Sequence, residues 1–164
     1  MKTIMRNSMY LPMAAALLTA ALAGPAVAEE LVPFHGTLQA QELIVPGPLP
    51  ETILADGTGG GNATQLGQYT LTWKFTVNLA DGTGSGPVHF IAANGDDIFT
   101  MAAGSSVPIK PGYFQITETH TITGGTGRFA NAQGSFIVVR VINFNAGSSS
   151  GSFQGTITST GSAK

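Results

Sequence analysis

The sequence contains no cysteine and few charged residues. Its 164 residues include 7 Lys and Arg and 9 Asp and Glu, so that charged residues make up 10% of the chain. This is less than half of the roughly 25% that soluble proteins usually carry. Without cysteine the chain has no disulfide, no thiolate nucleophile and no Cys-ligated metal site. A formal net charge of −2 argues against a nucleic-acid partner, because phosphate binding needs clustered Lys and Arg.

Motifs that hold metals, phosphates or nucleophiles are also missing. The 3 His lack the close spacing of metal ligands, and no Gly-x-Ser-x-Gly motif occurs. The segment 124–127 is glycine-rich but lacks the Lys-Ser/Thr of a phosphate-binding loop. The two Asp-Gly-Thr-Gly elements, at 56–59 and 81–84, are typical of turns and do not fit an EF-hand loop. We therefore expect no cofactor and no metal.

The first 28 residues have the order of parts of a secretory signal peptide. Lys2 and Arg6 precede an apolar stretch, 11–23, and Ala26-Val27-Ala28 forms an A-x-A cleavage site. The apolar stretch of about 13 residues is too short for a spanning helix, which needs about 20. No later segment is long and apolar enough to span a bilayer. We expect residues 29–164 to form a single exported domain, located in the periplasm or outside the cell.

The rest of the chain alternates between apolar and polar residues with the period of β-strands. In 69–78 the alternation is complete, which predicts a strand with one buried face. That face would consist of Tyr69, Leu71, Trp73, Phe75 and Val77. Further strands are expected at about 31–42, 87–93, 97–103, 112–123, 134–145 and 151–159.

Turn signals separate these strands. Asn94-Gly95 predicts a type I′ hairpin, in which both residues have positive φ. The Gly/Ser run 147–151 predicts a hairpin tip, and 81–86 predicts a looser connection. We expect the Pro- and Gly-rich stretch 46–62 to be a long surface loop. Seven or eight short strands joined by hairpins predict an all-β antiparallel barrel or sandwich, and closure into a barrel would remove exposed strand edges.

Charged residues lie on the apolar face of one predicted strand. In 113–122, Glu118 and His120 have the parity of the apolar residues Phe114, Ile116 and Ile122. The opposite parity carries Tyr113, Gln115, Thr117, Thr119 and Thr121, which is typical of a solvent-facing side. Glu118 and His120 are therefore predicted to point into the interior.

Arg140 in the following strand shares the parity of Phe136, Val138 and Ile142. A buried charge is tolerated only when it is paired, so we predict an interior polar cluster of Glu118, His120 and Arg140. This cluster is the candidate catalytic or ligand-orienting site. Two alternatives remain. Because 136–144 is apolar on both parities, Arg140 could instead point outward or into a subunit interface, and a bulge could turn Glu118 to solvent.

The segment 122–136 resembles the hallmark of the allene oxide cyclase/dirigent superfamily. In that group a strand runs into a motif like Gly124-Gly125-Thr126-Gly127-Arg128-Phe129, and a glycine such as Gly134 precedes the next strand. The resemblance is to bacterial secreted members. It implies an eight-stranded antiparallel barrel of lipocalin-like shape, closed at one end by Phe129 and often trimeric. Plant members catalyse or direct cyclisation of reactive intermediates, whereas many bacterial relatives have no assigned activity.

Three functions follow from these expectations. The first is binding of a small apolar ligand in or at the barrel, with Trp73, Phe75 and Phe114 as candidate contacts. The second is a cyclase or isomerase in which the interior polar cluster acts on the substrate. The third is a structural or interaction protein with a filled barrel, because eight strands enclose only enough space for side chains or one small ligand. We place binding without catalysis first.

Overall fold

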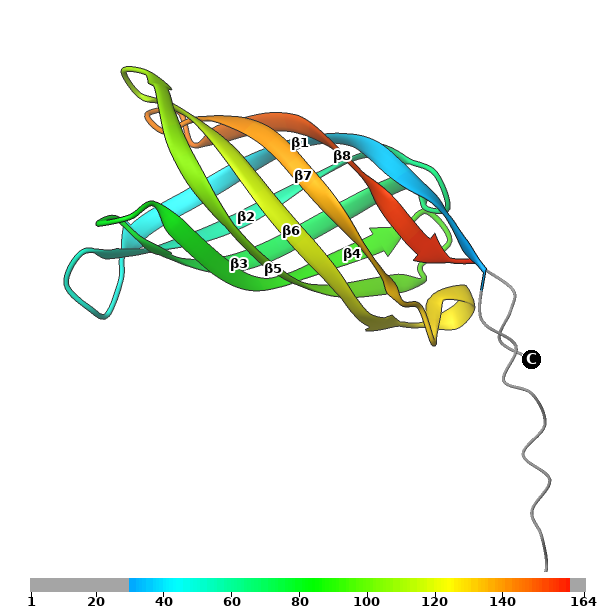
Figure 1. The fold of residues 1–164 in the computed structure, drawn as a ribbon. Coiled ribbons are helices and arrows are strands. Elements are labelled where there is room, and N and C mark those ends of the chain that lie inside the picture. The colour runs from blue at the N-terminus through cyan, green and yellow to red at the C-terminus, as the bar shows by residue number, and fades with distance from the viewer. Residues whose placement is uncertain (1–29, 160–164) are drawn as a thin grey trace, which may run out of the picture.

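The computed structural model describes residues 30–159, so the expected signal peptide and its cleavage site lie outside the described residues. The described residues form eight strands and one short 3-10 helix: β1 (Leu31–Pro46), β2 (Thr52–Ala63), β3 (Gly67–Asn78), β4 (Thr83–Ala92), β5 (Asp97–Lys110), β6 (Tyr113–Gly125), η1 (Gly127–Phe129), β7 (Gly134–Asn143) and β8 (Ser148–Thr158). Each strand pairs antiparallel with the next, and β8 pairs with β1 (Figure 1). The predicted all-β, eight-stranded antiparallel barrel is confirmed. Within 30–159 no helix has the length and apolarity needed to cross a membrane.

The barrel has two different ends. The closed end carries η1 and the β2–β3 and β4–β5 turns (Figure 1). Phe129 of η1 and Leu66 of the β2–β3 turn are buried there, so the predicted closure by Phe129 is confirmed. The other four turns lie at the opposite end, which we call the open end. Between the two ends, the predicted face of β3 is buried at Tyr69, Leu71, Trp73 and Phe75 and partly buried at Val77.

The prediction of a surface loop over 46–62 is wrong, because most of that stretch is strand β2. Asp56-Gly57-Thr58-Gly59 therefore lies in a strand and is not a turn. The glycines have a packing role. The Trp73 ring of β3 lies directly over Gly57, where any side chain would clash with it. Glycine here makes room for a large aromatic neighbour, whereas the second such element does turn, with Gly82 at a φ of 70°.

Two hairpins differ in detail from the prediction. Asn94-Gly95 does join β4 to β5, but only Gly95 has a positive φ, of 86°. Its amide donates to the Ala92 carbonyl at 2.9 Å, as in a type I turn followed by a left-handed glycine, so the type I′ prediction is wrong. The predicted tip at 147–151 is also displaced. The chain reverses over 144–147, and the serines of 148–150 are paired within β8.

Candidate functional site

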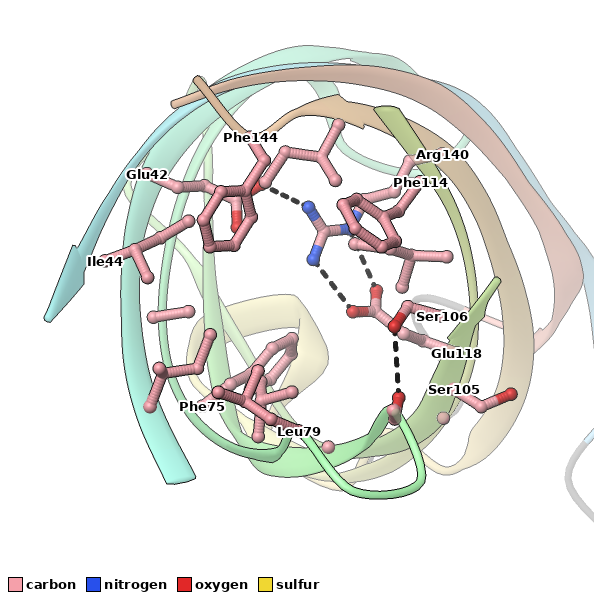
Figure 2. Close-up of a pocket in the computed structure, with 18 residues that line it drawn as sticks. Glu42, Ile44, Phe75, Leu79, Ser105, Ser106, Phe114, Glu118, Arg140 and Phe144 are labelled. Carbon is pink, nitrogen blue, oxygen red and sulfur yellow. Dashed lines mark hydrogen bonds and ion pairs between the residues drawn. The ribbon is translucent and has the colours of Figure 1, made fainter. Parts of the chain in front are cut away.

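The open end of the barrel contains a cavity of about 110 Å³. Its wall is mostly apolar and comes from every strand except β8, with these apolar members: Ile44, Ile53, Ala55, Phe75, Val77, Leu79, Phe114, Ile116, Ile142 and Phe144. Its charged lining residues are Glu42, Glu118 and Arg140 (Figure 2). Glu118 and Arg140 also line a smaller void deeper in the barrel, so they form the floor of the cavity.

Arg140 is the centre of the floor. Its Nε donates to Glu118 Oε2 at 3.3 Å and its Nη2 donates to Glu118 Oε1 at 3.0 Å, which is a bidentate pair. Its Nη1 donates to Ser149 Oγ at 3.2 Å and also to Glu42 Oε1. The exposed fractions of the Glu42, Glu118 and Arg140 side chains are 2%, 8% and 3%. Such fork-shaped pairs fix geometry as well as charge.

Strand register explains why these groups meet. Arg140 of β7 is opposite Ile116 of β6, so the inward-facing Glu118 is its diagonal neighbour. On the other side Arg140 is opposite Gly151 of β8, where a Cβ would crowd the Arg140 backbone and Cβ. Because Gly151 has no side chain, Arg140 reaches past β8 to Glu42 on β1.

His120 lies one layer deeper than the floor. Its Nδ1 is 3.1 Å from Thr100 Oγ1, and its ring stacks on Phe136 with centroids 4.7 Å apart. Its Nε2 is 3.7 Å from Glu118 Oε2, which is longer than a hydrogen bond, and has no other hydrogen-bond partner. His120 therefore contacts the far side of Glu118 and does not line the cavity.

Trp73 lies in the same deep layer. Its ring packs under the Arg140 guanidinium, which is 5.1 Å from the ring centroid, a cation–π distance. Its Nε1, like His120 Nε2, is buried without a hydrogen-bond partner. The void that both residues line has a volume of about 10 Å³, at the lower limit for holding one water molecule. Trp73 thus supports the floor from below.

The charges of the floor are set by their mutual proximity. Burial works to raise the pKa of Glu118, but the adjacent His120 and Arg140 outweigh it and hold that pKa below its ordinary value. Burial works to lower the pKa of Arg140, but Glu118 and Glu42 hold it above its ordinary value. Near neutral pH the floor therefore holds an ionised Glu118 and a protonated Arg140. An ionised carboxylate can accept a proton or a hydrogen bond but cannot donate one.

The structure brings together the three predicted cluster residues Glu118, His120 and Arg140. The predicted placement of these residues is therefore confirmed. Both alternatives are wrong: Arg140 points inward, and the irregularities of the β5–β6 pair lie at Phe99/Thr100 and Pro108/Lys110, away from Glu118. Of the predicted ligand contacts, Phe75 and Phe114 line the cavity and Trp73 does not. What the cluster and these rings do stays a prediction, as does the homo-oligomer.

Sequence reasoning missed three polar residues at or next to the floor: Glu42, Thr100 and Ser149. The inward direction of Glu42 could have been predicted from the sequence, because Glu42 continues the parity of Leu38 and Ala40 in its own strand. Ser149 lies in a run of serines that resembles a turn, so its inward direction follows only from the pairing of β8 with β7. Long-range pairing was therefore needed to complete the site.

Comparison with known proteins defines the class of fold. No family model matches the chain, and no curated protein sequence matches it. Among solved structures, the pterocarpan synthase dirigent protein GePTS1 is similar, with a TM-score of 0.61 and 15% sequence identity over 85% of this chain and 96% of that one. At this identity the likeness concerns the fold. The chain shares the eight-stranded barrel fold of this dirigent protein, which is the fold that the resemblance of segment 122–136 implies.

Proposed function

We propose that the protein binds a small ligand with an apolar body in the open half of the barrel. The observation that carries this proposal is the cavity itself, with an apolar wall and a fixed polar floor. Small-molecule sites commonly combine an apolar lining with a few placed polar groups. A barrel filled throughout by its own side chains would have left no such space. The third function inferred from the sequence, a filled structural barrel, is therefore less well supported.

The dimensions of the cavity suggest the size of the ligand. A cavity of about 150 Å³ in another protein holds benzene, so about 110 Å³ accommodates at most one ring or a short alkyl chain. Exposed apolar side chains at the open end, among them Leu49, Leu79 and Phe144, could cover a part of the ligand that extends beyond the cavity. We therefore propose a ligand whose end is inserted and whose remainder lies at the mouth.

The location of this activity is part of the proposal. The signal peptide expected over residues 1–28 would place the barrel in the periplasm or outside the cell. A cyclase or isomerase in the same cavity is the second candidate function. It is favoured by the ionised Glu118 at the cavity surface, which could act as a base. His120 would then be a positioning residue behind Glu118, because it does not reach the cavity.

A matched pair of substitutions tests the binding proposal. Ile44 lines the cavity and its neighbour Leu43 points outward. We expect benzyl alcohol, followed by NMR chemical-shift titration, to bind the unmodified barrel and Leu43→Trp alike. Ile44→Trp should weaken binding at least about tenfold, since an indole fills a space that holds one ring. Equal binding by both variants, or no binding by the unmodified protein, would contradict the proposal.

A further inference from the structure

Two carboxylates share one guanidinium at the floor of the cavity. Of the described residues that line the cavity, the only charged ones are Glu42, Glu118 and Arg140. With both carboxylates ionised, this set has a net charge of −1. From the proposed function, on which this inference rests, we propose that the site selects ligands whose polar end is a cation, such as a protonated amine, over ligands that end in a carboxylate.

The hydrogen bonds of the floor favour a donor from the ligand. Arg140 already donates to Glu118 through Nε and Nη2, and to Glu42 and Ser149 through Nη1. Four of its five N–H groups are thus directed at protein acceptors. An ionised carboxylate has about four acceptor positions, whereas Glu42 accepts one of these bonds and Glu118 accepts two. The floor therefore offers free acceptors and few free donors.

Among the described residues, the elements packed around the floor contribute no Lys and no second Arg to it. The polar or charged residues around the cavity, its floor and the void beneath it are Glu42 of β1, Tyr69 and Trp73 of β3, Thr100, Ser105 and Ser106 of β5, Glu118 and His120 of β6, Arg140 of β7 and Ser149 of β8. His120 is the only basic residue of this set besides Arg140. Its buried Nε2 is directed to the Glu118 side of the floor without making a hydrogen bond, so Glu118 keeps an acceptor for a donor arriving from the mouth.

Charge balance decides which ligands the site prefers. A buried carboxylate without a partner is costly, and attraction between opposite charges strengthens where water is excluded. A bound ammonium group would bring the net charge of the floor to zero. A bound carboxylate would raise the excess negative charge and would find Arg140 already engaged. A neutral alcohol lies between these two cases.

Three probes with one ring and different polar ends test this inference: benzylamine, benzyl alcohol and benzoate. They are titrated into the protein by calorimetry at about pH 8, where a primary amine is protonated. We expect benzylamine to bind at least about tenfold more tightly than benzyl alcohol, the size of one charge-assisted hydrogen bond. Benzoate should bind most weakly. Benzoate affinity equal to or above that of benzylamine overturns the inference.

The substitution Glu42→Gln supplies a second, independent readout. It removes the excess charge and keeps a hydrogen-bond acceptor for Arg140, so the preference for benzylamine over benzyl alcohol should fall to about twofold or less. Glu30→Gln is the matched control, because Glu30 is exposed at the closed end; it should keep the full preference. An undiminished preference in Glu42→Gln overturns the inference. If that variant does not fold, the three-probe comparison in the unmodified protein still decides.

Benzyl alcohol separates this inference from the proposed function. Binding of benzyl alcohol without any preference for benzylamine would overturn the charge selectivity and leave the proposed binding function in place. Failure of all three probes to bind would overturn both. Circular dichroism and thermal unfolding of each variant show whether the barrel is intact in every comparison.

Discussion

The two halves of the barrel use the same strands and opposite packing. In the closed half, Phe34, Phe90, Phe136 and Phe153 are buried with ring centroids 5.0–6.3 Å apart, at distances typical of favourable aromatic pairs. In the open half the inward residues leave a cavity above the charged floor. The strand pattern that closes the barrel does not determine whether it is filled; the size of the inward side chains does.

This comparison assigns different roles to the two halves. The closed half supplies packing energy, and its rings stack against His120 and hold it behind Glu118. The open half is less completely packed and contains a cavity with charged residues at its floor. The polar floor is the boundary between them, so its disruption should affect both halves. The predictions below test this division.

The largest effect is expected from Arg140→Ala. This change leaves Glu42 and Glu118 buried without their guanidinium, which should lower the free energy of unfolding by about 3–5 kcal/mol at neutral pH. Urea unfolding measures the loss. Arg128→Ala is the control: Arg128 is a partly exposed side chain at the closed end, and its removal should cost no more than about 0.5 kcal/mol. Equal effects of the two changes would contradict the assignment of Arg140 to a buried floor.

The same substitution at the two ends should have unequal effects. Leu66 in the β2–β3 turn is 1% exposed, whereas Leu79 in the β3–β4 turn is 56% exposed. Leu66→Ala creates a cavity in the packed half and should cost about 3 kcal/mol. Leu79→Ala removes an exposed side chain at the mouth and should cost no more than about 0.5 kcal/mol. Thermal unfolding of both variants gives the comparison, and similar losses would show that both ends are packed alike.

The sequence predicts the closed half better than the open half, and the reason is physical. Period-2 alternation reports which side of a strand is buried, so the face containing Trp73 and the inward direction of Glu118 were correctly predicted. Alternation does not report the volume enclosed by eight strands. The cavity therefore could not be predicted, and Trp73 could not be assigned to the layer below the floor.

Glycine explains the main error in the predicted fold. A strand with glycines at 57, 59, 60 and 61 resembles a loop, because glycine is usually unfavourable in strands. A residue that is remote in sequence explains why glycine is needed in this strand: the Trp73 ring occupies the space above Gly57. Gly151 has the same relation to Arg140. Such glycines are recognisable only when the register of the neighbouring strand is known.

Two glycines at the closed end should show smaller effects with different causes. Gly127 has a φ of 52°, so Gly127→Ala introduces backbone strain of about 1–2 kcal/mol, and the added Cβ would also displace the Asp96 carboxylate. Gly125 does not have a positive φ; it is required because a Cβ would clash with the Asp97 carbonyl. Gly95→Ala is the control for backbone strain without a clash, since Gly95 has a positive φ of 86° and open space around it. If thermal unfolding gives unchanged stability for both Gly125→Ala and Gly127→Ala, the closed-end turn is not constrained as described.

The smallest expected effect is the loss of stability in acid, which should begin in the open half. The pKa of Glu118 in the folded protein lies below its ordinary value of 4.5. A depressed folded pKa means that the unfolded chain binds the proton more readily. Ionised Glu118 therefore contributes stability that is fully present above about pH 4.5 and is lost as pH falls through the folded pKa. Arg140, whose pKa is raised, stays protonated throughout this range and adds no slope of its own.

Replacement of Glu118 by Gln should consequently flatten the decrease of unfolding free energy below about pH 4.5, while lowering stability at neutral pH through loss of the buried ion pair. Glu30→Gln, at the exposed residue that precedes β1, should leave the slope unchanged. Amide exchange followed by NMR adds the spatial test. In acid, amides of the strand ends around Glu42 and Phe114 should lose protection before those around Phe34 and Phe136. Simultaneous loss at both ends would show that the floor does not divide the barrel into two halves.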